Sequence, residues 1–478
     1  MIIKNYIYNA LFQLLRIILP VVTMPYIARV LSAEGVGAYS VSAAWANFFM
    51  IVGMIGIDTY GSRQIAYARG DFDKLQKVFW EINLLKTIST LFNIVVYGGV
   101  IFALVRPSNI CIYYIQIINL LSCTLDVSWY YAGIEDFKST SVRNIFVKII
   151  STIAIFIFVK TENDVWIYTM ILCLGQFLGQ TVLWKDIFEK MFPIQIPRLE
   201  SLSFHLPKTV FLWIPSLAAS LYNYLDKVML GVFTNDYQVG IYDYSQNLVK
   251  IPATLIFAIA TVTMPHVAAD FANKNEKEAS DVFYKSMRIV TMLALPMCFG
   301  FMAISENFVA WFLGDSYYEV GYLLKISAWV VLPISCSQIV GNQQIIAKGR
   351  EKIYSIAICS GAVVNILLNL LFVKEYMAKG VLVASIIAEV VVLLLMIVFT
   401  AKDFSIKTAF SGIQNYIIAS LLMYYIIKTI SQVIKLQPFL FTVVQIIIGV
   451  LSYVVILALI RDKGAGFVYG YVRKNILK

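Results

Sequence analysis

The stretch Val36-Gly37-Ala38-Tyr39 recurs 203 residues later as Val239-Gly240-Ile241-Tyr242. Further along the chain, Val78-Phe79-Trp80 recurs as Val282-Phe283-Tyr284 at nearly the same offset. The shared order of these matches indicates an internal repeat. The sequence therefore predicts two related halves, each built from the same series of segments.

The composition is that of a membrane protein. Hydrophobic residues make up 60% of the 478 residues, charged residues only 14%, and the mean hydropathy is +0.78. A soluble domain carries about 25% charged residues. Apolar runs of about 20 residues recur along the chain, each long enough to cross a bilayer. Because backbone groups in lipid must be satisfied internally, these runs are predicted to be helices.

We expect an all-α polytopic membrane protein with about 14 transmembrane helices. The predicted spans are 7–30, 36–58, 82–105, 109–133, 142–160, 164–187, 209–232, 238–265, 286–312, 319–345, 353–374, 379–401, 411–430 and 437–460.

The repeat joins spans of the same orientation, so the halves are predicted to be related by a pseudo-two-fold axis along the membrane normal. We expect an N-lobe over 1–187, a C-lobe over 209–401, and two further helices with a basic tail over 402–478. The stretch 188–208, with three prolines, is predicted to be a cytoplasmic linker. Transporters of this design hold their substrate between the halves.

Charge predicts the orientation. Most of the 38 lysines and arginines fall in segments on the side of the N-terminus, which places both termini in the cytoplasm. The formal net charge of +10 is thus mainly a feature of the cytoplasmic loops and gives no reason to expect nucleic acid as a partner.

Polar residues of the first span form one stripe at helical spacing: Asn5, Asn9, Gln13 and Arg16. An arginine at the centre of a span costs about 2.5–3.5 kcal/mol on insertion scales, so Arg16 should avoid lipid. It either faces an aqueous cavity or is paired inside the bundle, and the rest of the chain favours the cavity.

The second half has comparable stripes. Lys250 lies near mid-span, as Arg16 does, and both are expected to face the cavity. Four other cations lie nearer predicted span ends, where interhelical hydrogen bonds or snorkelling to the interface are the simpler interpretation: Lys86, Lys148, Arg29 and Lys325. The predicted cavity residues are Arg16, Lys250, Arg29, Lys227, Lys325, Asn9, Gln13, Asn223 and Asn247.

Acidic residues within or beside the spans are candidates for coupling or gating. Asp226 and Asp243 are placed to neutralise Lys227 and Lys250, whereas Asp126 and Glu389 could pair with a base or carry a coupling proton. The full set of candidates is Asp58, Arg63, Asp126, Glu135, Asp226, Asp243 and Glu389.

Signals for enzymatic chemistry are missing from the sequence. No glycine is followed directly by lysine, so there is no P-loop, and the six cysteines form no metal or disulfide pattern. A structural role is expected for His205 and His266. We therefore predict no catalytic residue, no metal and no cofactor. Fixed positive charge among amides and hydroxyls suits an anionic, hydroxyl-rich headgroup instead.

Several stretches resemble bacterial oligosaccharide-lipid flippases, which carry O-antigen and capsule repeat units and belong to the multidrug, oligosaccharidyl-lipid and polysaccharide exporter superfamily. The resemblance is strongest in Asp126-Val-Ser-Trp-Tyr-Tyr-Ala-Gly-Ile-Glu-Asp-Phe137. Further similar stretches are Pro25–Arg29, Gly56–Arg63, Tyr224–Gly231 and Gly341–Gln344.

The resemblance implies two six-helix lobes, a central cationic cavity and alternating access in the bacterial cytoplasmic membrane. The implied cargo is an undecaprenyl-pyrophosphate-linked oligosaccharide, with a polysaccharide polymerase as a candidate partner. Spans 13 and 14 would form a groove for the lipid tail. At the cytoplasmic rim, Arg63 would pair with Glu135 or Asp136, as a gate or as a solvated surface pair.

Two alternatives remain open from the sequence. A cation-drug antiporter of the same superfamily would need acidic residues where the first span has Arg16. A membrane polysaccharide polymerase would need catalytic residues in a substantial loop, and the predicted outer loops are mostly short.

Overall fold

The protein is helical throughout the part that the structure describes. The computed structural model describes residues 2–195, 197, 199–273, 275–433, 436–462 and 464. Side chains are described in these ranges except those of 2–14, 16, 17, 199, 215, 216, 218, 219, 221–223, 255, 258 and 262. By packing, the chain divides into two compact units, Met1–Gly240 and Ile241–Lys478.

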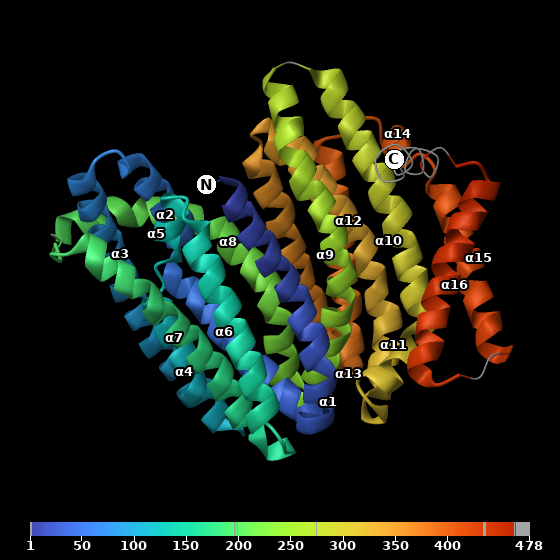
Figure 1. The fold of residues 1–478 in the computed structure, drawn as a ribbon, viewed down its shortest axis with the longest axis horizontal. Helices are drawn as coiled ribbons and strands as arrows, with labels where there is room; N and C mark the ends of the chain where they lie inside the picture. The colour runs from blue at the N-terminus through green and yellow to red at the C-terminus, as the bar shows by residue number, and fades with distance from the viewer. Residues whose placement is uncertain are drawn as a thin grey trace. The chain divides into compact units, whose positions relative to one another are not determined.

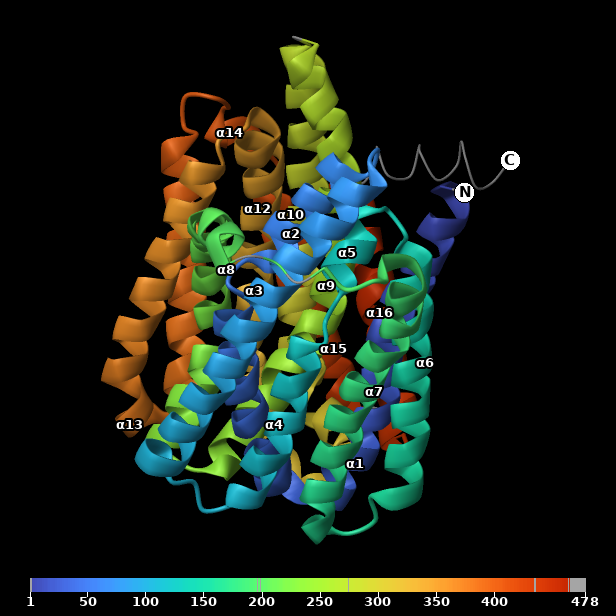
Figure 2. The same cartoon turned by 90° about the vertical axis from the view of Figure 1, so that its left-hand side faces the viewer.

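The first unit contains eight α-helices, seen in Figure 1 and, from the side, in Figure 2. They are α1 (Ile2–Met54), α2 (Ile57–Ala68), α3 (Phe72–Gly98), α4 (Ile110–Thr124), α5 (Ser128–Gly133), α6 (Phe137–Phe158), α7 (Val165–Met191) and α8 (Leu199–Phe233). A π-helical turn, η1 (Gly99–Val105), continues α3.

Helix α9 (Asp236–Ala272) begins in the first unit and continues into the second. The remaining helices are α10 (Glu276–Phe312), α11 (Tyr318–Ser327), α12 (Val331–Val340), α13 (Glu351–Phe399), α14 (Ile406–Ala409), α15 (Ile413–Val433) and α16 (Pro438–Leu459). The π-helical turn η5 (Gly341–Ile345) follows α12.

The predicted membrane architecture is confirmed. Among the described residues, ten helical segments are long and apolar enough to cross a membrane, or eleven with the bent α9. Two of the ten contain a break, at Ser32 (φ 62°) in α1 and at Met377 (φ 49°) in α13, and each corresponds to two predicted spans. Helix α3 begins at Phe72, ten residues before the predicted start of its span.

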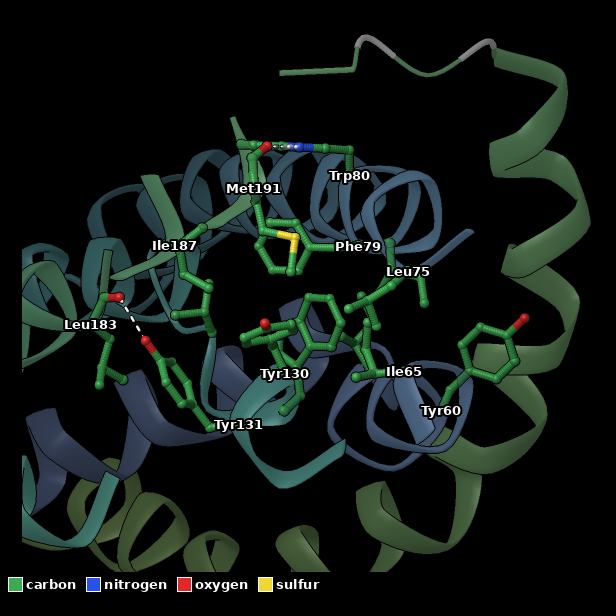
Figure 3. Packing of buried hydrophobic residues seen from close by; sticks show 14 of the residues in the cluster. Tyr60, Ile65, Leu75, Phe79, Trp80, Tyr130, Tyr131, Leu183, Ile187 and Met191 are labelled. Atoms are coloured by element: carbon green, nitrogen blue, oxygen red, sulfur yellow. Dashed lines mark hydrogen bonds between the residues drawn. The ribbon is translucent and has the colours of Figure 1, made fainter. Parts of the chain in front are cut away.

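An aromatic core packs α2, α3, α5 and α7 together within the first unit (Figure 3). Phe79 of α3 stacks on Trp129 of α5 with ring centroids 5.4 Å apart. Trp80 Nε1 donates to the carbonyl of Met191 (3.0 Å), and Tyr131 OH donates to the carbonyl of Leu183 (2.9 Å). These bonds fasten α3 and α5 to α7.

Helix α8 packs along the first unit, against α1, α2 and α3. Trp213 Nε1 donates to the carbonyl of Ile51 (2.9 Å). A Cβ on Gly56, whose φ is 77°, would lie 2.6 Å from the carbonyl oxygen of Thr209. The first unit therefore includes the helix that the repeat assigns to the second half, and the lobe boundaries stay a prediction from the repeat.

A buried histidine joins α8 to α2 and α3. The side chain of His205 is only 4% exposed. Its Nδ1 lies 2.7 Å from Tyr60 OH, and its Nε2 lies 3.2 Å from a carboxylate oxygen of buried Glu81. Both ring nitrogens are thus used in contacts within the protein, which is the structural role expected for this residue.

Gly37 of α1 and Gly240 of α9 occupy equivalent positions of the repeat, and each contacts the main chain of the other helix in the same way. A Cβ on Gly37 would lie 1.7 Å from the carbonyl oxygen of Asp236, and a Cβ on Gly240 would lie 2.0 Å from that of Ala33. Positions 33 and 236 are related by the same offset as 37 and 240. The crossing of α1 and the first turn of α9 therefore has the pseudo-two-fold symmetry of the sequence repeat, and only glycine permits it.

We predict that Gly37→Ala and Gly240→Ala each lower the stability of the purified protein in detergent. The new methyl group would overlap main-chain atoms, which cannot move as a side chain can, and overpacking costs about 1–3 kcal/mol. Thermal unfolding measures the effect. Gly300→Ala is the matched control, because its Cβ would meet only Met423 Cε at 3.9 Å. Equal melting temperatures for all three variants would contradict this account.

We predict a second loss of stability for His205→Ala. Removal of the ring leaves the buried side chains of Glu81 and Tyr60 without this hydrogen-bond partner, and a buried polar group left unsatisfied costs about 1–3 kcal/mol. The exposed His266→Ala should melt as the parent does. A melting temperature for His205→Ala within a degree of the parent's would show that the network contributes nothing.

Candidate functional site

A buried polar stripe runs along α3, and the sequence analysis missed it. Its members share one helix face at spacings of seven, three, four, three and four residues, and all are buried: Gln76, Asn83, Lys86, Thr90, Asn93 and Tyr97. Their spacing follows the same helical periodicity as the polar stripe predicted for the first span. Five of the six lie inside the predicted span 82–105, so the signal was present in the sequence.

Four stripe residues donate to main-chain carbonyls of neighbouring segments. Gln76 Nε2 donates to Met191 (3.0 Å), and Tyr97 OH donates to Tyr113 (3.1 Å). The amide of Asn93 donates to the carbonyl of Phe49, and the ammonium of Lys86 donates to that of Asp126. The stripe thus attaches α3 to α1, α4 and the end of α7.

Lys86 is the centre of this stripe and is fully buried, at 0% exposure. Its hydrogen bond to the Asp126 carbonyl is an interhelical contact, one of the two interpretations that the sequence left open for this lysine. Lys86 lies in the 34-residue candidate span Phe72–Val105, which is longer than the about 20 residues needed to cross a bilayer. A buried ionisable residue in such a segment is costly unless it is paired or hydrogen-bonded.

Asp126, one of the predicted coupling residues, occupies the break between α4 and α5. Its carbonyl accepts from Lys86, and its carboxylate accepts from the Ser128 main-chain N–H (2.7 Å). Arg143 Nη2 donates to Ser128 Oγ (3.2 Å) and interacts electrostatically with Asp126. The Lys86 amine therefore meets two groups of Asp126. It donates to the main-chain carbonyl at the helix break, and it interacts electrostatically with the carboxylate.

Asp58, also predicted, lies near the start of α2 with an exposed side chain. It interacts electrostatically with both Lys86 and Asp126. Two of the predicted acids, Asp58 and Asp126, thus lie within electrostatic range of Lys86.

The rim contacts differ from those predicted. Glu135 pairs with Arg69, with 3.0 Å between Arg69 Nη1 and Glu135 Oε2, whereas Arg63 Nε donates to Tyr67 OH (3.2 Å). Glu135 follows α5 in a left-handed turn (φ 61°), which places it by the end of α2. Asp136 instead caps α6, where it accepts from the N–H and the hydroxyl of Ser139. The Arg69–Glu135 pair is solvent-exposed and worth about 0–1 kcal/mol.

The predicted α9 residues cover a range of environments. Asp243 is buried, Asn247 is half-buried, and Lys250 is exposed near the middle of the 37-residue helix. Along α8, Asp226 is buried and its neighbour Lys227 half-buried. Of the other cations, Arg29 is exposed and Lys325 of α11 forms an ion pair with Glu306 of α10.

The second unit contains buried polar groups of its own. Gln343, in the π-helical turn η5, donates to Thr263 Oγ1 (2.6 Å) and to Ser286 Oγ (3.0 Å). On α13, Asn365 and Glu389 are buried, the latter among the predicted coupling residues. The side chains of four predicted cavity residues lie outside the described part of the structure: Asn9, Gln13, Arg16 and Asn223.

The amino-acid sequence matches two known protein families. The family described as "Polysaccharide biosynthesis protein" matches residues 2–269, and the MatE family matches residues 213–371. The protein named "Putative O-antigen transporter" of Shigella dysenteriae is 22% identical over 379 residues, which are 79% of this chain and 94% of that one. Its namesake in Escherichia coli is 19% identical over 84% of this chain and 97% of its own length.

Solved structures share the fold. The structure titled "Lipid II flippase MurJ, inward closed conformation" has a TM-score of 0.72 and 16% identity, covering 96% of this chain and 98% of that one. An inward-facing multidrug resistance MATE family transporter of the MOP superfamily has a TM-score of 0.62 and 14% identity, covering 81% and 97%. The resemblance drawn from the sequence is thus confirmed, and this multi-pass membrane protein belongs to the polysaccharide biosynthesis protein family.

Proposed function

We propose that the protein is a flippase that moves undecaprenyl-pyrophosphate-linked oligosaccharide repeat units from the cytoplasmic to the outer leaflet by alternating access. The family match over residues 2–269 carries the proposal. It is supported by relatives whose names are those of an O-antigen transporter and of a low-salt glycan biosynthesis flippase, Agl15 of Haloferax volcanii. The exported units would serve the synthesis of a surface polysaccharide.

The cationic residues explain how such a cargo is recognised. Arg16 and Lys250 are fixed positive charges near the middle of long apolar helices, and Lys250 has an exposed side chain. Guanidinium and ammonium groups are well matched to phosphate oxygens. We propose that both attract the pyrophosphate into a hydrated cavity, assisted by Arg29, Lys227, Lys325 and the amides Asn9, Gln13, Asn223 and Asn247, while the lipid tail stays in the bilayer.

We further propose that the two halves defined by the repeat rock against each other in the bacterial cytoplasmic membrane, with both termini in the cytoplasm. The excess of lysine and arginine in the loops on the side of the N-terminus supports this orientation. Asp226, Asp243 and Glu389 are proposed to balance the cavity charges, and Arg63 and Glu135 to lie at the cytoplasmic rim.

A cation-drug antiporter is the second candidate function. The MatE match over 213–371 and the multidrug transporter of similar fold favour it. The arginine at position 16 argues against it, because it would repel a cationic drug from the first span. Resistance of cells to organic cations distinguishes the two functions.

We predict that deletion of the gene traps intact lipid-linked repeat units on the cytoplasmic leaflet and abolishes the surface polymer. Extraction of lipid-linked oligosaccharides and analysis of the surface polysaccharide measure both pools against the parent strain. Exported but unpolymerised units would favour a polymerase, and unchanged pools in a strain without a second flippase would favour the antiporter.

We predict that charge at positions 16 and 250 is required for export. Arg16→Ala and Lys250→Ala should each lower surface polysaccharide at least tenfold when reintroduced into the deletion strain, whereas Arg16→Lys should retain part of it because the phosphate contact survives. Lys277→Ala, an exposed lysine in the first turn of α10, is the control. Equal export by Arg16→Ala and Arg16→Lys at normal membrane abundance would exclude Arg16 from cargo binding.

A further inference from the structure

We infer that each half of the repeat carries a strap, a short segment at the exit of its last helix that is bonded back onto its third helix, and that both straps stay closed during transport. The inference rests on the proposed flippase function and names connections that do not bend. Strap 1 is residues 191–195, at the end of α7, and strap 2 is residues 403–405, after α13. The third helices are α3 and α10.

The first argument is the set of bonds that hold strap 1. Gln76 Nε2 of α3 donates to the main-chain carbonyls of Met191 (3.0 Å) and Pro193 (3.1 Å). The Oε1 of this buried side chain accepts from Gln195 Nε2 (2.8 Å). Trp80 Nε1, four residues further along α3, also donates to the carbonyl of Met191 (3.0 Å; Figure 3). These four bonds fasten the strap at both its ends and in its middle.

The second argument is that the chain is fastened again in the second turn of α8. His205 contacts Glu81 of α3 (3.2 Å) and Tyr60 of α2 (2.7 Å). Glu81 directly follows Trp80, so the connection between α7 and α8 is held at both ends by neighbouring turns of α3. A connection held in this way cannot absorb a rotation between the halves of the protein. Such a rotation has to be absorbed beyond His205.

The third argument is that the second unit repeats the arrangement. Trp80 of α3 recurs in the sequence repeat as Tyr284 of α10. Tyr284 OH accepts from the main-chain N–H of Ser405 (2.9 Å), six residues after the end of α13. The same position of the third helix thus bonds to the exit of the last helix in both units, with donor and acceptor exchanged. Its recurrence indicates a feature of the repeated fold and not an accident of one loop.

Two further contacts hold strap 2. The ring of Phe404 packs on that of Phe283 of α10, with centroids 4.7 Å apart. Asp403 forms ion pairs with Arg350 (2.6 Å) and Lys348 (3.2 Å), both in the turn before α13. Each of the three residues of strap 2 therefore has a contact within the second unit.

Strap 2 leads into the last two helices, and α10 holds these helices as well. Tyr453 OH of α16 donates to the carbonyl of Met292, in the middle of α10 (2.7 Å). Trp311 Nε1, in the last turn of α10, donates to Thr442 Oγ1 near the start of α16 (2.8 Å). Helices α15 and α16 pack against each other and against α10, so we expect the pair to move with the second unit.

The straps have a direct use in the proposed rocking movement. Domains that rock as rigid bodies absorb the movement in a few residues of loops or helix ends. Connections between helices are the usual places for such hinges, and the straps close two of these connections onto their own unit. Gln76, Trp80 and Tyr284 are therefore positioning residues, which act through the straps and not on the cargo.

The first test measures the straps without transport. A lysine-specific protease is added to the purified full-length protein, and cleavage is followed after the exposed Lys190 and Lys402, which directly precede the straps. Cleavage requires an open strap, so its rate follows the open fraction. We expect slow cleavage of the parent, about tenfold faster cleavage of Gln76→Leu at Lys190, and about fivefold faster cleavage of Tyr284→Phe at Lys402.

The matched controls for this test are Gln116→Leu and Tyr97→Phe. Each removes the same type of buried group away from the straps, since Gln116 Nε2 donates to Ser42 Oγ (3.3 Å) and Tyr97 OH to the carbonyl of Tyr113 (3.1 Å). Both controls should be cut at the parent's rates. Parent rates in the two strap variants, or an equal increase in the controls, would overturn the inference.

The second test asks whether the straps stay closed during transport. In a cysteine-free protein, Gln76→Cys is paired with Gln195→Cys, and Tyr284→Cys with Ser405→Cys. A bis-methanethiosulfonate reagent joins each pair, and a reductant removes it. The protein is placed in liposomes with polyprenyl-pyrophosphate-linked N-acetylglucosamine, tritiated in the sugar, as the probe, and an external lectin reports the fraction in the outer leaflet. We expect both locked proteins to move the probe within twofold of the unlocked rate.

The outcomes separate the inference from the proposed function. A locked protein that stops moving the probe and recovers after reduction overturns the inference, because its strap must then open in each cycle, and leaves the flippase function intact. Single-cysteine variants treated with the same reagent show that the effect requires the crosslink. Failure of the parent to move the probe at all removes the flippase function, and with it the inference that the straps stay closed during transport.

Discussion

The absence of hydrogen-bonding solvent in a bilayer is the constraint on which the rest of this structure depends. Every polar group that lies inside must find its partner within the protein. In the first unit α3 meets this demand with buried donors that reach the main-chain carbonyls of Phe49, Tyr113, Asp126 and Met191. Such bonds fix helices relative to one another more specifically than apolar packing in lipid can, because lipid tails compete equally well for apolar surfaces.

The same constraint explains where the chain is irregular. The chain leaves helical geometry at Ser32 and between α4 and α5, and at the second break the Lys86 ammonium donates to the freed carbonyl of Asp126. At Gly37 and Gly240 the approach is so close that a methyl group would overlap a carbonyl oxygen. Small residues permit such contacts between helices, and two glycines at equivalent positions of a repeat make the contact symmetric.

The sequence predicted the helical membrane architecture and its spans, because runs of apolar residues report directly on burial in lipid. It was wrong where the error in a helix boundary changed the environment of a residue. A predicted start at residue 82 put Lys86 near the end of its span, whereas α3 begins at Phe72 and Lys86 is fully buried within it. The partner of Glu135 could not be predicted either, since the turn after α5 decides whether Arg63 or Arg69 lies within reach.

The sequence repeat preserves one glycine contact and diverges in polarity along α3 and α10. Gly37 and Gly240 preserve the symmetric crossing, but Asn83, Lys86 and Thr90 of α3 correspond to Met287, Val290 and Ala294 of α10. All six positions are buried, so burial itself is conserved while polarity is not. The second half carries its charge elsewhere on the corresponding helix: Arg288 of α10, two residues before Val290, donates to Ser411 Oγ (2.7 Å). The two helices thus bury equivalent positions but attach to their neighbours through different hydrogen bonds, which in lipid give the specificity that apolar packing cannot.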